Sequence, residues 1–368
     1  MRRALLFLLI NLVNGAFLNA QNLEIYVSDA GNFGPPNKIL KYDENGQNPE
    51  TFIDTNLNWP QDILFLEDQN VVLVSNLNGG AINKYDIETG DFIETFASVI
   101  GGPTRMKIGP DDLIYVLQWS GSGRVLRYQQ DGTFVDNFTS IGISGSIGID
   151  WDSTGNMYVS SYNSDLVRRF DASGNDLGNF ISTNLVGPTN IDFQSNGDLI
   201  VLDYDGGSIK RFDSNGNFLN VFVSGLSQVE GIDFLDNGNI LIGNGGTSAV
   251  KMYNDQGVFI NDLVASGLGG LIRPNAVVIR DNPNLSATDY NLDTLGFLKN
   301  SMGSIFYIKE KVIPQIEHIE VYDALGKLMI TDLQNTSLID TSTLSKGIYL
   351  VKVILQDTQT LSQRIVVM

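Results

Sequence analysis

The sequence predicts an all-β protein in which a six-bladed β-propeller is followed by a small antiparallel β-sandwich. Three observations lead to this fold class. Short alternations of apolar and polar residues are separated by Gly-containing turns, an aromatic residue followed by a polar one recurs about every 42 residues, and no segment carries a sustained helical period. We expect the propeller at residues 21–280, a linker at 281–295 and the second domain at 296–368.

Residues 1–20 have the pattern of a secretory signal peptide. Arg2 and Arg3 provide a positive start, residues 4–13 are apolar, and cleavage is expected after Ala20. The apolar run is shorter than the roughly 20 residues that a transmembrane helix needs, and no later run is long and apolar enough to span. The sequence therefore predicts export without a transmembrane segment.

The composition limits the partners of this chain. With 42 acidic and 23 basic residues the formal net charge is −19, which opposes binding to nucleic acid or to an anionic membrane surface. The chain has no cysteine, which excludes disulfides, thiol catalysis, Cys-based zinc sites and lipid attachment at an N-terminal cysteine. We expect an exported monomer.

Six repeats make up the predicted propeller. Each carries an aromatic residue followed by a polar one, with spacings of 43, 43, 42, 42 and 41 residues. These aromatic residues are Tyr42, Tyr85, Tyr128, Phe170, Phe212 and Tyr253. The clearest repeat has strands at 188–193, 199–203, 208–213 and 218–223, separated by turns rich in Gly, Asn and Asp. Four-stranded units of this length are typical of propeller blades.

The phase of the repeats predicts how the ring closes. Residues 23–29 match the second strand of a blade, and residues 273–279, at the end of the last repeat, match a first strand. Pairing of these segments completes the sixth blade and removes the free sheet edges. Within the first strands, Asp150, Asp192 and Asp233 are expected to hydrogen-bond between blades near the axis.

These blades resemble the NHL-repeat family over about residues 23–280. The resemblance is carried by a short first strand, a turn with Gly, and a second strand ending in Asp or Asn. Examples are residues 187–193 with 199–203, and residues 230–234 with 239–244. The resemblance implies a six-bladed propeller but names no ligand.

The C-terminal residues resemble the type A sorting domain of the type IX secretion system of Bacteroidetes. Residues 319–329 match its Tyr-Asp-x-x-Gly-Lys turn, residues 344–353 its Leu-Ser-x-Gly-Ile-Tyr strand, and residues 363–368 its last strand. One departure is that Lys299–Ser301 replaces the usual Pro-Asn-Pro opening. The resemblance implies an antiparallel sandwich, interaction of residues 296–368 with that secretion machinery, and a secreted or outer-membrane surface-attached protein.

A candidate binding site lies where the first strands begin and the second strands end, because antiparallel pairing brings these ends to one face around the channel. Three consecutive second strands are followed there by an aromatic residue. Rings stack on apolar ligand faces while amides and carboxylates bind hydroxyls, so this face suits a polar glycan, peptide or protein ligand. The candidate residues are Trp59, Gln61, Asp62, Thr104, Arg105, Trp119, Tyr162, Asn190, Tyr204, Glu230 and Asn275, and Ile147 and Thr189 also begin first strands.

Two other interpretations stay open at this point. The polar residues can instead cap strand ends while the rings pack between blades. The other is a metal-dependent, lactonase- or esterase-like hydrolase or lyase, because six-bladed propellers of the gluconolactonase family hold a divalent cation, such as Ca²⁺, at the channel mouth with Glu, Asn and Asp, although that family's N-terminal Glu-Gly-Pro motif is absent here. Residues of the right type for that cation are Asn190, Asp203 and Glu230, in a different chain order from the family.

Virginiamycin B lyase propellers are similar in repeat pattern but depend on a catalytic histidine. The single histidine here, His318, falls in the C-terminal domain, which excludes histidine-based acid–base catalysis in the propeller. The sequence therefore favours a binding module over an enzyme, with no catalytic residue assigned and no cofactor expected.

Overall fold

The computed structural model describes residues 23–32, 34–281, 298–299, 305–307, 316–323, 326–330, 338–355 and 360–367. They belong to two compact units, one of which is Leu23–Asp281, and the other lies within Asn282–Met368. The predicted signal peptide and, apart from Asp281, the predicted linker lie outside the described residues. Among the described residues, no helix reaches the length and apolar character that a membrane span requires.

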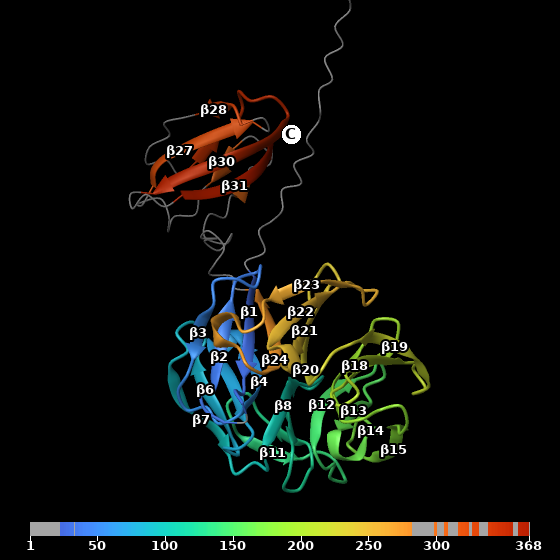
Figure 1. The fold of residues 1–368 in the computed structure, drawn as a ribbon. Coiled ribbons are helices and arrows are strands. Elements are labelled where there is room, and N and C mark those ends of the chain that lie inside the picture. The colour runs from blue at the N-terminus through green and yellow to red at the C-terminus, as the bar shows by residue number, and fades with distance from the viewer. Residues whose placement is uncertain are drawn as a thin grey trace, which may run out of the picture. The chain divides into compact units, whose positions relative to one another are not determined.

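The first unit consists of six four-stranded antiparallel sheets arranged as blades (Figure 1). Each sheet is given from its inner strand outwards, and the first two are β24 (Pro274–Asp281), β1 (Leu23–Asp29), β2 (Lys38–Tyr42) and β3 (Glu50–Ile53), then β4 (Pro60–Leu66), β5 (Val71–Asn76), β6 (Ala81–Asp86) and β7 (Phe92–Ser98). The third and fourth are β8 (Pro103–Ile108), β9 (Ile114–Gln118), β10 (Leu126–Tyr128) and β11 (Phe134–Asn137), then β12 (Ser146–Trp151), β13 (Met157–Ser161), β14 (Leu166–Phe170) and β15 (Asp176–Ile181). The fifth and sixth are β16 (Pro188–Phe193), β17 (Leu199–Asp203), β18 (Ser208–Phe212) and β19 (Phe218–Ser224), then β20 (Val229–Phe234), β21 (Ile240–Asn244), β22 (Ala249–Tyr253) and β23 (Phe259–Val264). Four short 3₁₀ helices occur in loops, at Glu67–Gln69, Tyr162–Ser164, Gly245–Thr247 and Leu268–Gly270.

The inner strands form a closed ring. Each of β4, β8, β12, β16, β20 and β24 contacts the next in this order, and β24 contacts β4. Carboxylates bridge the blades near the axis, since Asp150 accepts the N–H of Phe193 at 2.6 Å and Asp233 that of Ile279 at 2.7 Å. These two bridges between blades were predicted. Asp192 was predicted to form a third, but it accepts a hydrogen bond from the Gln194 amide of its own blade instead.

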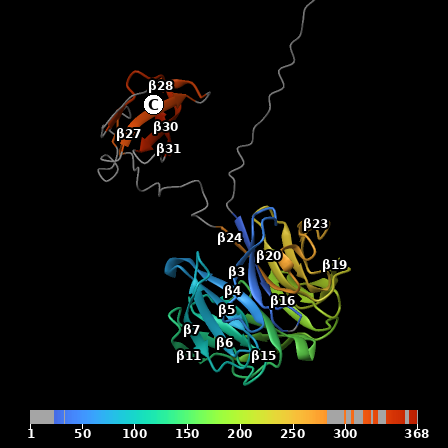
Figure 2. The ribbon, with the colours of Figure 1, turned by 60° about the vertical axis from the view of Figure 1, so that its left-hand side comes forward.

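Closure of the ring occurs through the strand pair predicted from the repeat phase. Strand β24 pairs with β1 from Leu23 opposite Asp281 to Asp29 opposite Pro274. The two strands lie side by side in the turned view of Figure 2. Because the last strand of the unit completes the sheet of the first, neither end of the unit leaves an unpaired inner edge.

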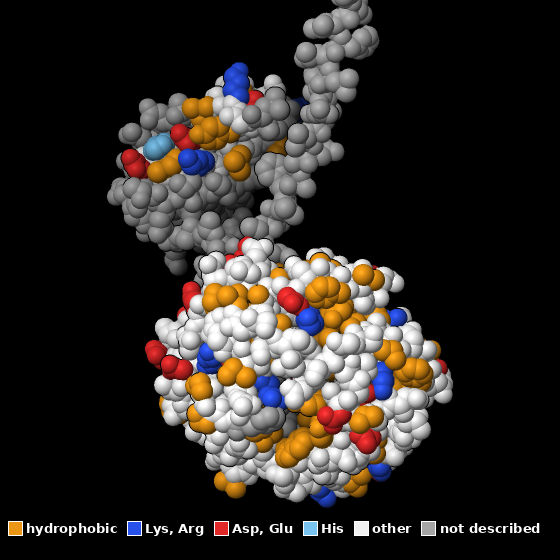
Figure 3. Space-filling view, in the orientation of Figure 1, with side chains coloured by type: hydrophobic (Ala, Val, Ile, Leu, Met, Phe, Trp, Pro, Cys, Tyr) orange, Lys and Arg blue, Asp and Glu red, His pale blue; other side chains and the backbone are white. Residues whose placement is uncertain are grey.

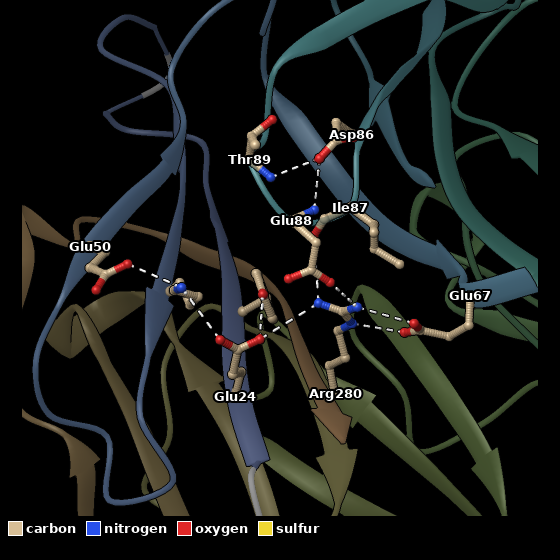
Figure 4. Close-up of polar contacts among 10 residues, drawn as sticks. Glu24, Glu50, Glu67, Asp86, Ile87, Glu88, Thr89 and Arg280 are labelled. Atoms are coloured by element: carbon tan, nitrogen blue, oxygen red, sulfur yellow. Dashed lines mark hydrogen bonds and ion pairs between the residues drawn. The ribbon is translucent and has the colours of Figure 1, made fainter. Parts of the chain in front are cut away.

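Arg280 of β24 ties this closed blade to the next one (Figure 4). Its guanidinium donates to Glu67 at 2.8 and 3.1 Å and to Glu88 at 3.0 Å, and it lies 3.6 Å from Glu24 of β1. The Arg280 side chain is only 3% exposed, and it lies over the ring of Phe65. A buried cation surrounded by three carboxylates is well placed to stabilise the closure.

The repeated aromatic residues pack between blades. All six are buried, and Tyr42, Tyr85, Phe170 and Phe212 have almost no exposed surface. The Tyr85 hydroxyl donates to the carbonyls of Thr55 and Asn56 in the loop that precedes its blade, and the Tyr42 hydroxyl donates to Leu268 in the same way. Each blade therefore buries one large ring against its neighbour, and this requirement explains why an aromatic residue recurs about every 42 residues in the sequence.

The second unit contains two antiparallel sheets. One has β28 (Leu328–Ile330), β27 (Ile316–Asp323), β30 (Gly347–Leu355) and β31 (Thr360–Val367), and the other has β25 (Leu298–Lys299), β26 (Ile305–Tyr307) and β29 (Leu338–Asp340). Ile339 of the smaller sheet packs into a core made by Ile319, Val321 and Val351 of the larger one. This is the sandwich that the sequence predicted.

The Tyr-Asp-x-x-Gly-Lys motif is the turn between β27 and β28. Asp323 accepts the Lys327 N–H on its carboxylate at 2.9 Å, and its own N–H donates to the Lys327 carbonyl at 2.9 Å. Gly326 has a φ of +80°, a conformation that favours glycine.

On the propeller, charged side chains of both signs are scattered over the face shown in Figure 3.

We predict that Arg280→Ala destabilises the propeller by about 2–3 kcal/mol, because it removes the buried guanidinium that joins Glu67 and Glu88 across the closure, while Glu24 keeps Lys41 as a partner at 3.3 Å. The free energy of unfolding, measured by urea denaturation, checks this. Arg168→Ala is the matched control, since its pair with Asp176 has side chains 26% and 25% exposed and should contribute no more than about 1 kcal/mol. Equal losses for the two variants would contradict a special role for Arg280.

Candidate functional site

Six hydrogen bonds of one kind shape the face on which the candidate residues lie. In each blade the residue after the second strand donates its N–H to the carbonyl of the residue before the first strand, at 2.8–3.3 Å. The donor and acceptor pairs are Ala30–Arg273, Leu77–Trp59, Trp119–Gly102, Tyr162–Gly145, Tyr204–Gly187 and Gly245–Gln228. These bonds fix the backbone at the mouth of the channel, where each pair carries at least one side chain and the other partner is glycine in four of the six blades.

The residue before the first strand has a left-handed backbone in five of the blades. Three of these residues are glycines, but Trp59 has a φ of +58° and Gln228 a φ of +54°. A left-handed conformation costs an L-residue roughly 1–2 kcal/mol. A residue as bulky as tryptophan is rare there, and such strain concentrates at functional sites.

The mouth of the channel opens into a cavity of about 360 Å³. Seven of the predicted residues line it: Trp59, Gln61, Trp119, Tyr162, Tyr204, Glu230 and Asn275. Ile147 and Thr189 line it as well, from the starts of β12 and β16. The cavity thus brings together side chains from all six blades of the ring.

Aromatic rings form one wall of this cavity. The ring centroids of Trp119 and Tyr162 are 5.5 Å apart, and those of Tyr162 and Tyr204 are 5.8 Å apart. The Tyr162 hydroxyl donates to Asp205 at 2.7 Å, and the Tyr204 hydroxyl accepts from Arg273 at 2.9 Å. The rings therefore contact their neighbours across blades and also remain half-buried at the cavity surface.

The floor comes from the second residue of each first strand. Gln61, Glu230 and Asn275 lie there with Ile147 and Thr189, and all five are buried. In the remaining blade this residue is Thr104, which is not part of the lining and donates its hydroxyl to the Ser146 carbonyl at 2.8 Å. The floor offers amide and carboxyl groups for hydrogen bonds.

Glu230 is the acidic group of this floor. Burial raises its pKa from the ordinary 4.5 to about 7, although the positive charges of Arg105 and Arg273 lower it and Asp62 raises it further. A carboxyl with a pKa near neutral can either donate or accept a proton at physiological pH. This is the one lining group whose charge changes in that range.

Three predicted residues face a different cavity. Asp62, Arg105 and Asn190 line a space of about 310 Å³ deeper along the first strands, together with Asp192 and Asp233. These three are the third residues of their strands, one position further along than the residues of the floor. Asp62 and Arg105 form a buried ion pair at 2.7 Å, so both contribute to the channel rather than to the aromatic cavity.

The residues suggested for a divalent cation do not line one common cavity. Asn190 faces the deeper cavity and Glu230 the aromatic one. The Asp203 carboxylate accepts hydrogen bonds from Lys210 and from the N–H of Val186, so it serves the loop of its own blade. Within the described part of the chain, no three His, Cys, Asp or Glu residues are placed to hold a metal ion.

The cavity contains three residues that the sequence analysis did not single out, namely Leu77, Asn78 and Arg273. Arg273 precedes Pro274 just as Trp59 precedes Pro60, and Leu77 follows a second strand just as Trp119 does. The same positional rule applied to every blade would have found both of them. Nothing in the pattern around Asn78 distinguishes it from other turn residues.

Comparison with known families assigns the C-terminal part of the chain. Residues 300–368 match the family described as the secretion system C-terminal sorting domain. The predicted sorting domain is confirmed. It indicates that the protein is exported and is located at the cell surface or secreted. No curated protein matches the sequence.

Solved structures similar to this chain show the propeller fold. A chain from a nidogen/laminin complex is 15% identical with a TM-score of 0.58, and the match covers 70% of this chain and 98% of that one. A protein of unknown function from Bacteroides caccae is 16% identical with a TM-score of 0.54, covering 71% and 100%. A proposed gluconolactonase is 13% identical with a TM-score of 0.50, covering 69% and 86%.

We predict that Glu230→Gln gains stability relative to the native protein as the pH rises from about 4.5 to 7. The folded state holds the Glu230 proton more tightly than the unfolded state, so the native protein loses stability through this pH range. The Glu230→Gln variant has no proton to lose at this position and does not lose that stability. The relative gain should be on the order of 3 kcal/mol. Urea denaturation at several pH values measures it.

Asn275→Ala is the control for this experiment, because it removes a neutral neighbour from the same floor. Its difference in stability from the native protein should stay constant with pH. A Glu230→Gln difference that is equally constant would show that this carboxyl is not shifted.

Proposed function

We propose that the propeller is an extracellular binding module whose aromatic cavity holds a neutral polar ligand, a glycan or a peptide. The observation that carries the proposal is the arc of Trp119, Tyr162 and Tyr204 around a cavity of about 360 Å³. Cavities of this size with a few convergent polar groups are typical of small-molecule sites.

The chemistry of the lining supports a ligand with both apolar faces and hydrogen-bonding groups. The rings supply flat apolar surfaces, and the Gln61 and Asn275 amides and the Glu230 carboxyl lie below them. Arg273 supplies one positive charge beside the one carboxyl, so the site has no strong excess of either sign. A neutral ligand suits such a lining best.

The fold itself does not decide between binding and catalysis, because it occurs both in a nidogen/laminin complex and in a proposed gluconolactonase. A metal-dependent reaction forms no part of the proposal, since Asn190 and Glu230 line different cavities and Asp203 is paired with Lys210. The floor of amides and the wall of rings need no cofactor to bind a ligand.

We predict that Trp119→Ala, Tyr162→Ala and Tyr204→Ala each weaken ligand binding about tenfold or more, because each removes a stacking surface. Glycan and peptide arrays probed with the full chain measure this. Phe259→Ala is the matched control, as this ring is 50% exposed on an outer strand, away from the cavity. Unchanged binding by all three cavity variants would refute the proposal.

We also propose export by type IX secretion, with residues 296–368 as the signal and removal of residues 1–20 on the way. A chain that ends at Asp281 should then stay inside the outer membrane, while the full chain reaches the surface or medium. Cell fractionation with an antibody to the propeller distinguishes these locations. Surface display of the shortened chain would contradict this role of the C-terminal domain.

A further inference from the structure

A groove of about 710 Å³ lies between the blade β4–β7 and the blade β8–β11. Residues 97–101, at the end of β7 and in the loop after it, form one wall, and Tyr128, Phe134 and Asn137 belong to the other. Strands β10 and β11 have three and four residues, against six and seven in β6 and β7. The shorter strands leave room between the blades. We call this space the Val99 groove.

Val99 at the lip of this groove is an outlier in two respects. Its side chain is 99% exposed, the highest value among the large exposed apolar residues of the described chain. Its φ is +61°, a left-handed backbone that β-branched residues rarely adopt. An apolar side chain held in a strained and fully exposed position has no role in the packing of the propeller, and such strain points to a function.

The other blades provide an internal comparison for this position. Each loop between a fourth strand and the next first strand has a Leu or Ile three residues before that strand begins, as Ile100 here, and this residue is buried in all blades except one, where Leu57 is half-buried. The residue before this Leu or Ile is Asn56, Gly142, Asn184, Gly225 or Gly270 in the other five blades. Four of these five residues, all except Gly142, have left-handed backbone as Val99 does, and Asn and Gly tolerate this conformation, so Val99 is the single departure in residue type.

The Val99 groove adjoins the aromatic cavity. The ridge between them is made by two loop segments in contact, since Trp119 donates its N–H to Gly102 at 2.8 Å and Ser120 donates to Gly101 at 2.7 Å. The Trp119 side chain lines the cavity, and Gln118 and Gly101 line the groove. The cavity and the groove are therefore lined by adjacent residues of one segment, Trp119 and Gln118.

The groove suits an uncharged chain. Among the described residues that line it, none is charged, and the exposed apolar side chains of Val99 and Phe134 occur beside exposed polar side chains, those of Ser98, Ser122 and Asn137. Ring faces beside amide groups match repeating units that each have an apolar face and a rim of hydroxyls. These are the features of a neutral oligosaccharide.

We propose that the protein binds a neutral glycan chain, with one end in the aromatic cavity and further sugar units in the Val99 groove, where Val99 contacts them. This inference rests on the proposed function of the cavity. The cavity and the groove together are too large for a single sugar, so affinity should rise with the length of the chain.

The test uses the full chain on an array of neutral glycans of one to six sugar units. We expect Val99→Asn, which restores the residue found at positions 56 and 184, to unfold at the same or a higher urea concentration. It should nevertheless weaken binding of the longest glycans about tenfold and leave that of the shortest unchanged, because one apolar contact is lost from the groove alone.

Phe134→Ala gives a second test with a close control. Phe134 and Phe259 are each 50% exposed, and each ring lies 5.5 Å from a tyrosine of its own blade. Phe134→Ala should remove the dependence on chain length, and Phe259→Ala should keep it.

Three results would overturn the inference. First, short and long glycans could bind with equal affinity, and only Trp119→Ala could abolish this binding. The cavity would then be the whole site, and the proposed function would stand. Trp119-dependent binding of peptides, with no glycan bound, would assign the site to a peptide. If no glycan or peptide binds in a way that depends on Trp119, the proposed function is refuted as well.

Discussion

Pairing of β24 with β1 is the interaction on which the rest of the propeller depends. It joins Leu23 to Asp281 and Asp29 to Pro274, so the two ends of the unit lie in one sheet. Arg280 extends the closure to the next blade through Glu67 and Glu88. A ring of six sheets without this pair would leave two inner edges open and would not hold a central channel of defined width.

The closed ring explains why the aromatic cavity forms at one end of the channel. Closure brings six first-strand starts and six second-strand ends to the same face, and the six loop hydrogen bonds hold their side chains there. Large side chains follow the second strand in four consecutive blades, whereas Ala30 and Gly245 follow it in the other two. The cavity is therefore lined asymmetrically, although the six blades of the scaffold are alike.

The blades could be predicted because they depend on short-range patterns. A buried ring such as Tyr85 is needed once per blade, and the turns between strands need Gly or Asn, so both recur with the blade period. Trp119, Tyr162 and Tyr204 could be placed for the same reason, since each directly follows a second strand. Asn190 was placed with Glu230 because both lie near a strand start, yet it is one strand position further along and faces the deeper cavity.

The sequence by itself determined the number of blades, the closing strand pair, the sorting domain and the face that carries the aromatic rings, because each follows from a periodic or local pattern. The tertiary structure alone decided which polar residues converge. Lys210 donates a hydrogen bond to Asp203, Arg273 donates one to the Tyr204 hydroxyl, and the Val99 side chain is exposed at a groove between two blades. These outcomes depend on side-chain direction and on contacts between distant segments, and no pattern within one repeat contains that information.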